Sequence, residues 1–265
     1  MNAGRKMVCI KRFAEALSVL LLFAGIILSR LYLFDIYKIP SYSMEPTLMA
    51  GDYILVTKSE YGSRVISLSK LLFKRELAYK WHRGSGQPHI NDLIVFNHPL
   101  YGSEQGDVSS TFGHVMVKRV ACLPGDSVRI NRSGMDRAYS DVFPFDTALH
   151  WRVDNYGPLY VPQKDDTLDL TAQNLRHYGS VIRLENSVRQ EGYSLSIDQQ
   201  ARYVFTFDYY FVTGDNFYSS SDSRHWGFVP ETHIIGKVTR VLFSRDQSSL
   251  QKSRIRWERI MKKVN

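Results

Sequence analysis

Residues 16–34 read ALSVLLLFAGIILSRLYLF and form the longest apolar stretch of the chain. As an α-helix rising 1.5 Å per residue, this stretch would span roughly 28 Å, close to the ~30 Å hydrocarbon core of a bilayer. On length alone, its uncharged part, 16–29, also suits a signal-peptide core or a buried helix. Arg30 can extend to the headgroups, however, and no small-x-small cleavage motif follows. We therefore expect a retained transmembrane anchor.

The segment ahead of this stretch is basic. It carries Arg5, Lys6, Lys11 and Arg12, and no acidic residue precedes Glu15. By the positive-inside rule, such a flank stays in the cytoplasm and the rest of the chain crosses the membrane. No second apolar stretch of spanning length follows. The sequence thus predicts a single-pass protein with a cytoplasmic N-terminus and an extracytoplasmic domain.

The composition is that of a globular protein, with 44% hydrophobic and 23% charged residues. The net charge of +8 gathers near the two ends of the chain rather than in one basic patch with interleaved aromatic residues. This distribution favours contact with a membrane surface over binding of nucleic acid. The two cysteines, Cys9 and Cys122, belong to no CxxC or Cys/His cluster. Neither a disulfide framework nor a zinc site is expected.

Beyond residue 35 the pattern is that of short β-strands rich in Val, Ile, Tyr and Phe and bounded by Gly, Asp, Pro and Asn. We therefore expect a mostly β fold, a β-rich core with an inserted second subdomain, preceded by one N-terminal transmembrane helix. The expected strands lie at 52–58, 92–98, 114–122, 127–131, 208–215 and 236–244.

Three segments differ from this pattern. Residues 64–82 are typical of a partly helical excursion or a lid, and 132–207 are polar and typical of an inserted subdomain. Residues 252–264 suit a basic amphipathic helix or strand, either solvated or in contact with anionic lipid. The expected division is 1–12 cytoplasmic N-terminus, 13–35 transmembrane anchor, 36–131 and 208–250 catalytic β core, 132–207 inserted subdomain, and 251–265 basic C-terminal tail.

Two hydroxyls directly follow the anchor. In KIPSYSMEPTL (38–48), Ser41 and Ser43 stand between two prolines. No G-x-S-x-G elbow, H-E-x-x-H motif or Walker-type loop occurs in the chain, and none of the eight histidines has an obvious triad context. A Ser-His-Asp triad stays open at this point, because its members need not be neighbours in sequence.

A lysine is the better candidate for a base. Lys118 interrupts the apolar run HVMVKRV, and strand alternation places it on the same face as Met116 and Val120. It could be an exposed lysine on an edge strand. If this face is buried instead, desolvation lowers the lysine pKa by up to ~3–5 units and makes the amine a general base near neutral pH.

A third stretch, TGDNFYSSSDSRHWGFVPETHIIGKV (213–238), begins with a turn signal. Asp222 and Arg224 could form a bidentate ion pair that fixes this loop. The short hydroxyl of Ser220 could bond a nearby amine. Taken alone, the stretch also suits a serine-rich surface loop.

Five motifs stand in order behind the anchor: SMEPTL, GDYILV, DLIVF, KRVACLPGD and GDNFYSSSDSRHWGFVP. Over about Tyr32 to Ser244 this order resembles the type I signal peptidases. The segment NYGPLYVP and the tail RIRWERIMKK are similar to one bacterial branch of that family. The resemblance implies a β-rich catalytic core, a serine–lysine dyad, and the release of secreted proteins from their membrane-bound signal peptides.

By motif, the resemblance implies that Ser43 is the nucleophile and Lys118 the general base. It implies an oxyanion hole made by the Ser41 hydroxyl and the Ser43 backbone N–H. No metal or cofactor is expected. The residues implied to support the dyad are Ser220, which orients the lysine, Gly214, which lies close to it, and the ion pair of Asp222 and Arg224.

The expected protein is a membrane-anchored serine endopeptidase that cleaves signal peptides from exported preproteins. It would sit in the inner (cytoplasmic) membrane with a periplasmic catalytic domain. Its expected partners are preproteins and the lipid bilayer, with proximity to the secretion translocon and no nucleic acid. Two alternatives remain: a dedicated serine–lysine peptidase of the same fold for pilin or a few exported substrates, and a non-enzymatic anchored β-domain, against which the intact motif residues argue.

Overall fold

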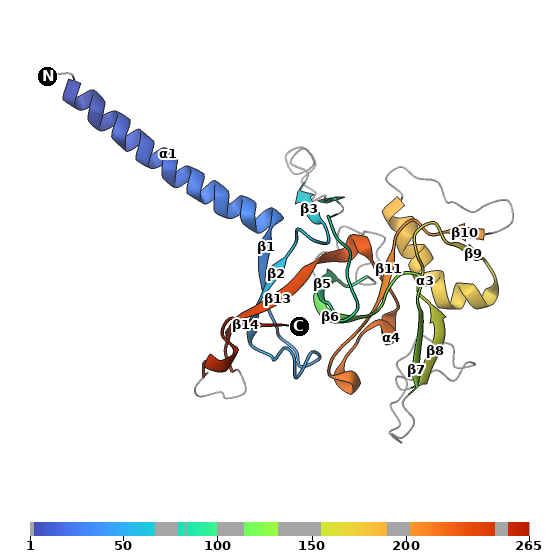
Figure 1. The fold of residues 1–265 in the computed structure, drawn as a ribbon. Helices are drawn as coiled ribbons and strands as arrows, with labels where there is room; N and C mark the ends of the chain where they lie inside the picture. The colour runs from blue at the N-terminus through green and yellow to red at the C-terminus, as the bar shows by residue number, and fades with distance from the viewer. Residues whose placement is uncertain are drawn as a thin grey trace.

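The computed structural model describes residues 3–66, 79–82, 84–99, 114–131, 155–189, 202–246 and 254–264. A long helix, α1 (Ala3–Tyr32), projects from a β-rich body (Figure 1). Its segment Lys11–Arg30 is long and apolar enough to cross a membrane, and none of it is buried against the rest of the chain. The predicted fold class is confirmed: a mostly β protein preceded by one apolar helix.

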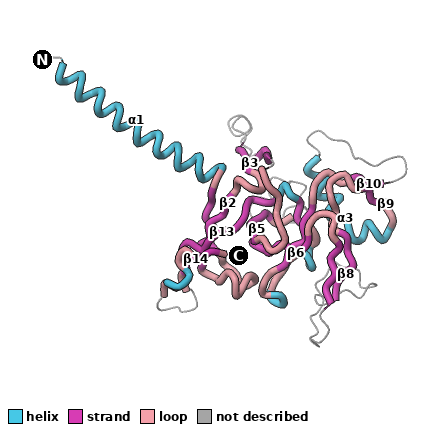
Figure 2. Tube along the Cα trace, viewed as in Figure 1, coloured by secondary structure: helices cyan, strands magenta, loops and turns pink. Residues whose placement is uncertain are grey.

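The body is built on an eight-stranded sheet with the order β1-β2-β13-β5-β6-β11-β12, in which β14 also pairs with β13 (Figure 2). The described pairings are antiparallel. Each of the six predicted strands is present within a few residues of its expected bounds. The strands of this sheet are β1 (Phe34–Lys38), β2 (Asp52–Thr57), β5 (Leu93–Asn97), β6 (Val115–Cys122), β11 (Tyr209–Thr213), β12 (Val229–Pro230), β13 (Ile234–Ser244) and β14 (Lys262–Lys263).

Both faces of the central strand β5 are buried, which explains its unbroken apolar sequence. Because side chains alternate along a strand, Leu93 and Val95 enter one hydrophobic cluster, and Ile94 and Phe96 enter the cluster on the other face. The sheet is therefore covered on both sides where β5 meets β6. A polar side chain on β6 at this position is forced out of water.

Smaller elements lie beyond the end of the sheet that carries β11 (Figure 1). They pack on Tyr209 and Phe211 of β11 through one aromatic and aliphatic cluster. Within the expected insertion at 132–207, residues 132–154 and 190–201 lie outside the described part. The described elements here are β7 (Ser127–Asn131) paired with β8 (Asn155–Tyr160), β9 (Thr167–Asp169) paired with β10 (Arg202–Val204), and α3 (Ala172–Arg189).

The structure modifies two expectations. The described ends of 64–82 are strands, β3 (Ser63–Ile66) and β4 (Tyr79–His82), which pair with each other; the helical expectation falls on 67–78, outside the described residues. The tail is not one amphipathic helix. It forms a 3-10 turn, η6 (Trp257–Arg259), followed by β14.

A buried ion pair explains the path of the tail. Arg259 donates from Nε to Asp52 Oδ1 at 3.0 Å and from Nη2 to Asp52 Oδ2 at 2.5 Å. It also donates to the Thr47 carbonyl at 2.9 Å. Burial would raise the pKa of Asp52, but the hydrogen bonds from Arg259 and Ser244 hold it below its usual value. The tail turns because one guanidinium must reach the start of β2.

Removing the Arg259 guanidinium should therefore destabilise the fold. Arg259→Met leaves the Asp52 carboxylate buried without its cation, and breaking a buried pair in this way costs about 3–5 kcal/mol. Urea unfolding of the detergent-solubilised chain measures the loss. The control is Lys262→Met, an exposed change in the same tail that should stay within about 0.5 kcal/mol of the parent. Equal stability of both variants would contradict a structural role for the pair.

Candidate active site

Ser43 lies in the loop between β1 and β2, and apolar side chains on both sides fix this loop to the core. Ile39, Met44 and Leu48 are buried in the cluster beneath β2 and β13. The Ile39 backbone N–H donates to the Asp52 carbonyl at 2.8 Å, closing the base of the loop. The alternation of apolar and polar residues in this segment leaves Ser43 half-buried at the surface.

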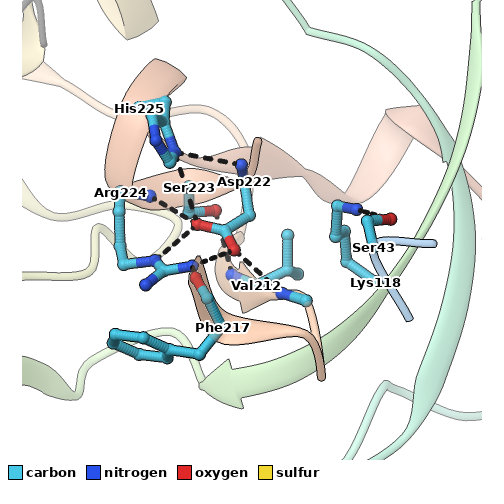
Figure 3. Close-up of polar contacts among 9 residues, drawn as sticks. Ser43, Lys118, Val212, Phe217, Asp222, Ser223, Arg224 and His225 are labelled. Atoms are coloured by element: carbon cyan, nitrogen blue, oxygen red, sulfur yellow. Dashed lines mark hydrogen bonds and ion pairs between the residues drawn. The ribbon is translucent and has the colours of Figure 1, made fainter. Parts of the chain in front are cut away.

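Lys118 lies on β6, opposite Ile94 of β5, and its side chain is buried with a relative exposure of 2%. Its Nζ donates to Ser43 Oγ at 2.7 Å (Figure 3). The alternative of an exposed lysine on an edge strand is wrong, because β5 and β11 flank β6 on its two sides. The two side chains, 75 positions apart in sequence, thus form a serine–lysine contact.

Burial lowers the pKa of Lys118 to about 8. The carboxylate of Asp222 raises it, the guanidinium of Arg224 lowers it, and the carboxylate of Asp215 raises it again; burial is the largest effect. Removing an ammonium from water disfavours its charged form. Among the described residues, the carboxylates of Asp222 and Asp215 act on Lys118 only through space, and burial outweighs them. With this pKa, roughly one tenth of the amine is neutral at pH 7, far more than for a solvated lysine with a pKa of ~10.4.

Ser41 lies beside the serine–lysine contact. Its Oγ is 3.3 Å from Ser43 Oγ, on the exposed side of the loop. The Ser43 hydroxyl thus contacts the Lys118 amine, and the Ser41 hydroxyl lies next to that of Ser43. Among the described residues, no group of three or more His, Cys, Asp or Glu side chains is placed to hold a metal ion.

Gly214 allows the stretch 213–238 to pack closely against the backbone of Ser43. A Cβ on Gly214 would lie 2.1 Å from Ser220 Oγ and 2.5 Å from the Ser43 carbonyl oxygen. Asn216 continues this contact, because its backbone N–H donates to the Ser43 carbonyl at 3.1 Å. Ser220 is buried here, but its Oγ makes no hydrogen bond to any described residue, including Lys118. The expected bond from Ser220 to the lysine is not present.

Asp222 and Arg224 form the expected bidentate pair. Arg224 donates from Nε and Nη2 to the two carboxylate oxygens at 2.8 and 2.7 Å, and both side chains are fully buried (Figure 3). Asp222 also caps the short helix α4 (Ser223–Trp226) and accepts from the Gly214 N–H at 2.9 Å. Burial would raise the pKa of Asp222, but the hydrogen bonds from Arg224 and His225 hold it well below its usual range. The pair therefore fixes Gly214 in place.

A second ion pair, which the sequence did not predict, lies beside the lysine. Arg119 donates from Nε and Nη2 to the two carboxylate oxygens of Asp215, both at 2.7 Å, and contacts Thr47 Oγ1 at 3.4 Å. This pair ties β6 to the loop after β11 and to the loop of Ser43. Both residues stand next to motif residues, Lys118 and Gly214, but their partnership over 96 positions leaves no local signal.

Comparisons with known proteins bear on the family of this chain. The family described as signal peptidase, peptidase S26, matches residues 10–243. The signal peptidase I of Buchnera aphidicola subsp. Schizaphis graminum is 26% identical over 262 residues, which cover 88% of this chain and 76% of that protein. The signal peptidase I of Pseudomonas fluorescens is 28% identical over 85% of this chain and 70% of its own. That of Aquifex aeolicus is 27% identical over 89% and 86%.

Because Gly214 packs so closely, any side chain at this position should lower the stability of the fold. Gly214→Ala forces a methyl group against the Ser43 carbonyl, and overpacking of this kind costs about 1–3 kcal/mol. The melting temperature of the full chain in detergent should fall by several degrees. Gly86→Ala is the matched control, because the nearest atom to its new methyl would be an ordinary 3.6 Å away. An unchanged melting temperature for Gly214→Ala would show that the loops are not in close contact.

Proposed function

The chain belongs to the signal peptidase family, peptidase S26, and we propose that it cleaves signal peptides with Ser43 as nucleophile and Lys118 as general base. The protein is a serine endopeptidase that processes signal peptides. The assignment of its catalytic groups rests on one observation: the buried amine of Lys118 donates to Ser43 Oγ at 2.7 Å. A nucleophile and base within hydrogen-bond reach are the signature of nucleophilic catalysis.

Acylation begins with neutral Lys118. Its lone pair accepts the proton of Ser43 Oγ, and the oxygen attacks the carbonyl carbon of the scissile peptide bond. The Ser43 backbone N–H and the Ser41 hydroxyl donate to the developing oxyanion. The C–N bond then breaks, and protonated Lys118 gives its proton to the leaving amine. The products of this half-reaction are an ester on Ser43 and the free N-terminus of the mature protein.

Deacylation repeats these roles with water. Lys118, neutral again, takes a proton from a water molecule whose oxygen attacks the Ser43 ester. Collapse of the second tetrahedral intermediate returns the proton to Ser43 Oγ and releases the signal peptide as a carboxylate. The pKa of about 8 suits both directions of transfer, because a catalytic pKa near the working pH balances proton affinity against availability. No step requires a metal or cofactor.

Helix α1 places the proposed active site at the membrane. The protein is membrane-anchored by α1. The basic N-terminal flank supports an orientation in the inner membrane with a cytoplasmic N-terminus and a periplasmic catalytic body. Preproteins held in the bilayer by their signal peptides are the substrates that a site close to the anchor can reach. We also propose that the enzyme works near the secretion translocon, where such substrates emerge.

The pH dependence of cleavage tests the dyad. Because only neutral Lys118 accepts the proton, kcat/KM should rise about tenfold per pH unit below about 8 and level off above it. Ser43→Ala and Lys118→Met should each lose about 10⁴-fold or more of the cleavage of a preprotein with an Ala-x-Ala site. The exposed changes Ser219→Ala and Lys262→Met should keep the activity and the profile of the parent.

Two outcomes would count against this mechanism. Activity that survives Lys118→Met would require another base, and a rise centred near the ordinary lysine value of ~10.4 would mean that the amine is not desolvated. A panel of preproteins run alongside separates a general processing enzyme from a dedicated one, because the latter would cleave only pilin or a few exported substrates.

The Ser41 hydroxyl should act in the transition state. Loss of one oxyanion donor costs about 2.7–4 kcal/mol, which corresponds to about 10²–10³ in kcat. Ser41→Ala should therefore lower kcat by this factor with little change in KM, and Ser41→Thr, which keeps the hydroxyl, should recover most of the loss. Steady-state kinetics on a peptide substrate measure both. A change confined to KM would assign Ser41 to substrate binding instead.

A further inference from the structure

The membrane helix passes into the catalytic sheet without a linker. Helix α1 ends at Tyr32 and β1 begins at Phe34, with Leu33 alone between them. The Leu33 N–H donates to the Ser29 carbonyl at 2.8 Å, and the Leu33 carbonyl accepts from the Lys58 N–H at 2.8 Å. The junction residue is therefore bonded on one side to the helix and on the other to the chain that leaves β2. A hinge of free residues is not present at this point.

Lys58 closes this junction, and the more exposed Arg30 adds a weaker contact, with its Nε 3.4 Å from Asp35 Oδ1. Lys58 Nζ donates to the Arg30 carbonyl in the last turn of α1 at 3.0 Å and to Asp35 Oδ2 at 2.9 Å. The last carbonyls of a helix lack intrahelical partners and carry partial negative charge. An ammonium at this position supplies the missing hydrogen bond and also interacts favourably with that charge. The Lys58 and Asp35 side chains are only 12% and 16% exposed. This is a shielded ion pair rather than a solvated surface contact.

Further bonds hold Asp35 in position. Its carboxylate accepts from the Ile36 N–H at 2.9 Å and from the Tyr37 hydroxyl at 3.3 Å. Burial would raise the pKa of Asp35, but the hydrogen bond from Lys58 keeps it below its usual value. Asp35 is thus charged across the working pH range. Its partner Lys58 joins three elements at one point: the end of α1, the start of β1 and the end of β2.

The same strands lead from the junction to the nucleophile. β1 pairs with β2 along its whole length, from Phe34 opposite Thr57 to Lys38 opposite Tyr53. It runs on from α1 into the body of the molecule (Figure 1). At its far end Ile39 is buried, and the loop of Ser43 follows. A strand rises about 3.4 Å per residue, so this length of β1 corresponds to roughly 17 Å.

We propose that the Lys58–Asp35 pair, closed on the last turn of α1, is a rigid coupling that fixes the position of Ser43 relative to the bilayer and so determines which bond of a membrane-held preprotein is cleaved. This inference rests on the proposed function. A signal peptide held in the same bilayer is positioned by the lipid, whereas the serine is positioned by α1. The alignment of Ser43 with the scissile bond of the signal peptide therefore depends on the stiffness of the junction between α1 and β1. Lys58 acts as a positioning residue for membrane-held substrates and has no part in the chemical steps.

Two substrates separate positioning from chemistry. The full-length enzyme is reconstituted in phospholipid vesicles and supplied either with a preprotein inserted in the same vesicles or with a short soluble peptide carrying an Ala-x-Ala site. Lys58→Met keeps the aliphatic stem and removes the ammonium. We expect its cleavage of the inserted preprotein to fall about tenfold or to spread to neighbouring bonds, as mass spectrometry of the new N-termini would show. Its cleavage of the soluble peptide should stay within about twofold of the parent.

Two control variants complete the experiment. Lys58→Arg can still donate to both the Arg30 carbonyl and Asp35, and it should restore cleavage at a single bond. Lys38→Met removes the same charge from an exposed position at the far end of β1 and should behave as the parent on both substrates. If Lys38→Met reproduces the defect, a general loss of positive charge explains it and the coupling is refuted.

The remaining outcomes are distinguishable from a failure of the proposed function. If Lys58→Met lowers cleavage of both substrates in parallel, the residue serves only to stabilise the fold, and the coupling is refuted. If Lys58→Met leaves both substrates and the cleaved bond unchanged, the coupling is likewise refuted. If the parent enzyme cleaves neither substrate, the proposed function itself has failed.

Discussion

In the contact between Lys118 and Ser43 the Lys118 amine is held out of water, and the low pKa of that amine depends on this burial. Removing an ammonium from water is costly, so a lysine side chain packed in a protein interior gives up its proton more readily than a solvated one. Here β5 and β11 flank β6, and both faces of β5 are covered by core. That cover lowers the pKa of Lys118 to about 8, as the proposed role of a general base requires. The β-sheet thus provides both the scaffold and the lowered pKa on which the proposed mechanism depends.

Ion pairs hold the loops around this bond. Asp222 and Arg224 are fully buried and fix Gly214, whose missing side chain lets the loop after β11 contact the Ser43 carbonyl. Their opposite charges also offset each other at Lys118, one raising and one lowering its pKa, so that burial decides the net result. A single unpaired carboxylate at the same place would raise the pKa of Lys118. The Asp222–Arg224 pair thus holds the loop in place while leaving the pKa of Lys118 low.

Local patterns predicted much of this structure. Five strands of the sheet, β2, β5, β6, β11 and β13, follow from alternating Val, Ile and Tyr, whereas β1, β12 and β14 were not predicted. The apolar stretch at 16–34 predicts the apolar part of α1. The contact of Ser43 with Lys118 followed from a resemblance, because strand alternation left both a buried and an exposed Lys118 open. Arg259, which pairs with Asp52 across 207 positions, was not predictable, so the path of the tail, which was expected to be a helix or a strand, could not be foreseen. Partners so far apart leave no periodic signal for a sequence to reveal.

The charge state of one side chain is the measurement that tests this account most directly. Lysine labelled with ¹⁵N at Nζ, observed by NMR in the detergent-solubilised chain, reports the titration of each amine, and the signal absent from Lys118→Met identifies the one of interest. A transition near pH 8 is predicted, because burial disfavours the ammonium. A transition near ~10.4, the value of a solvated lysine, would contradict the claim that the sheet makes Lys118 a base.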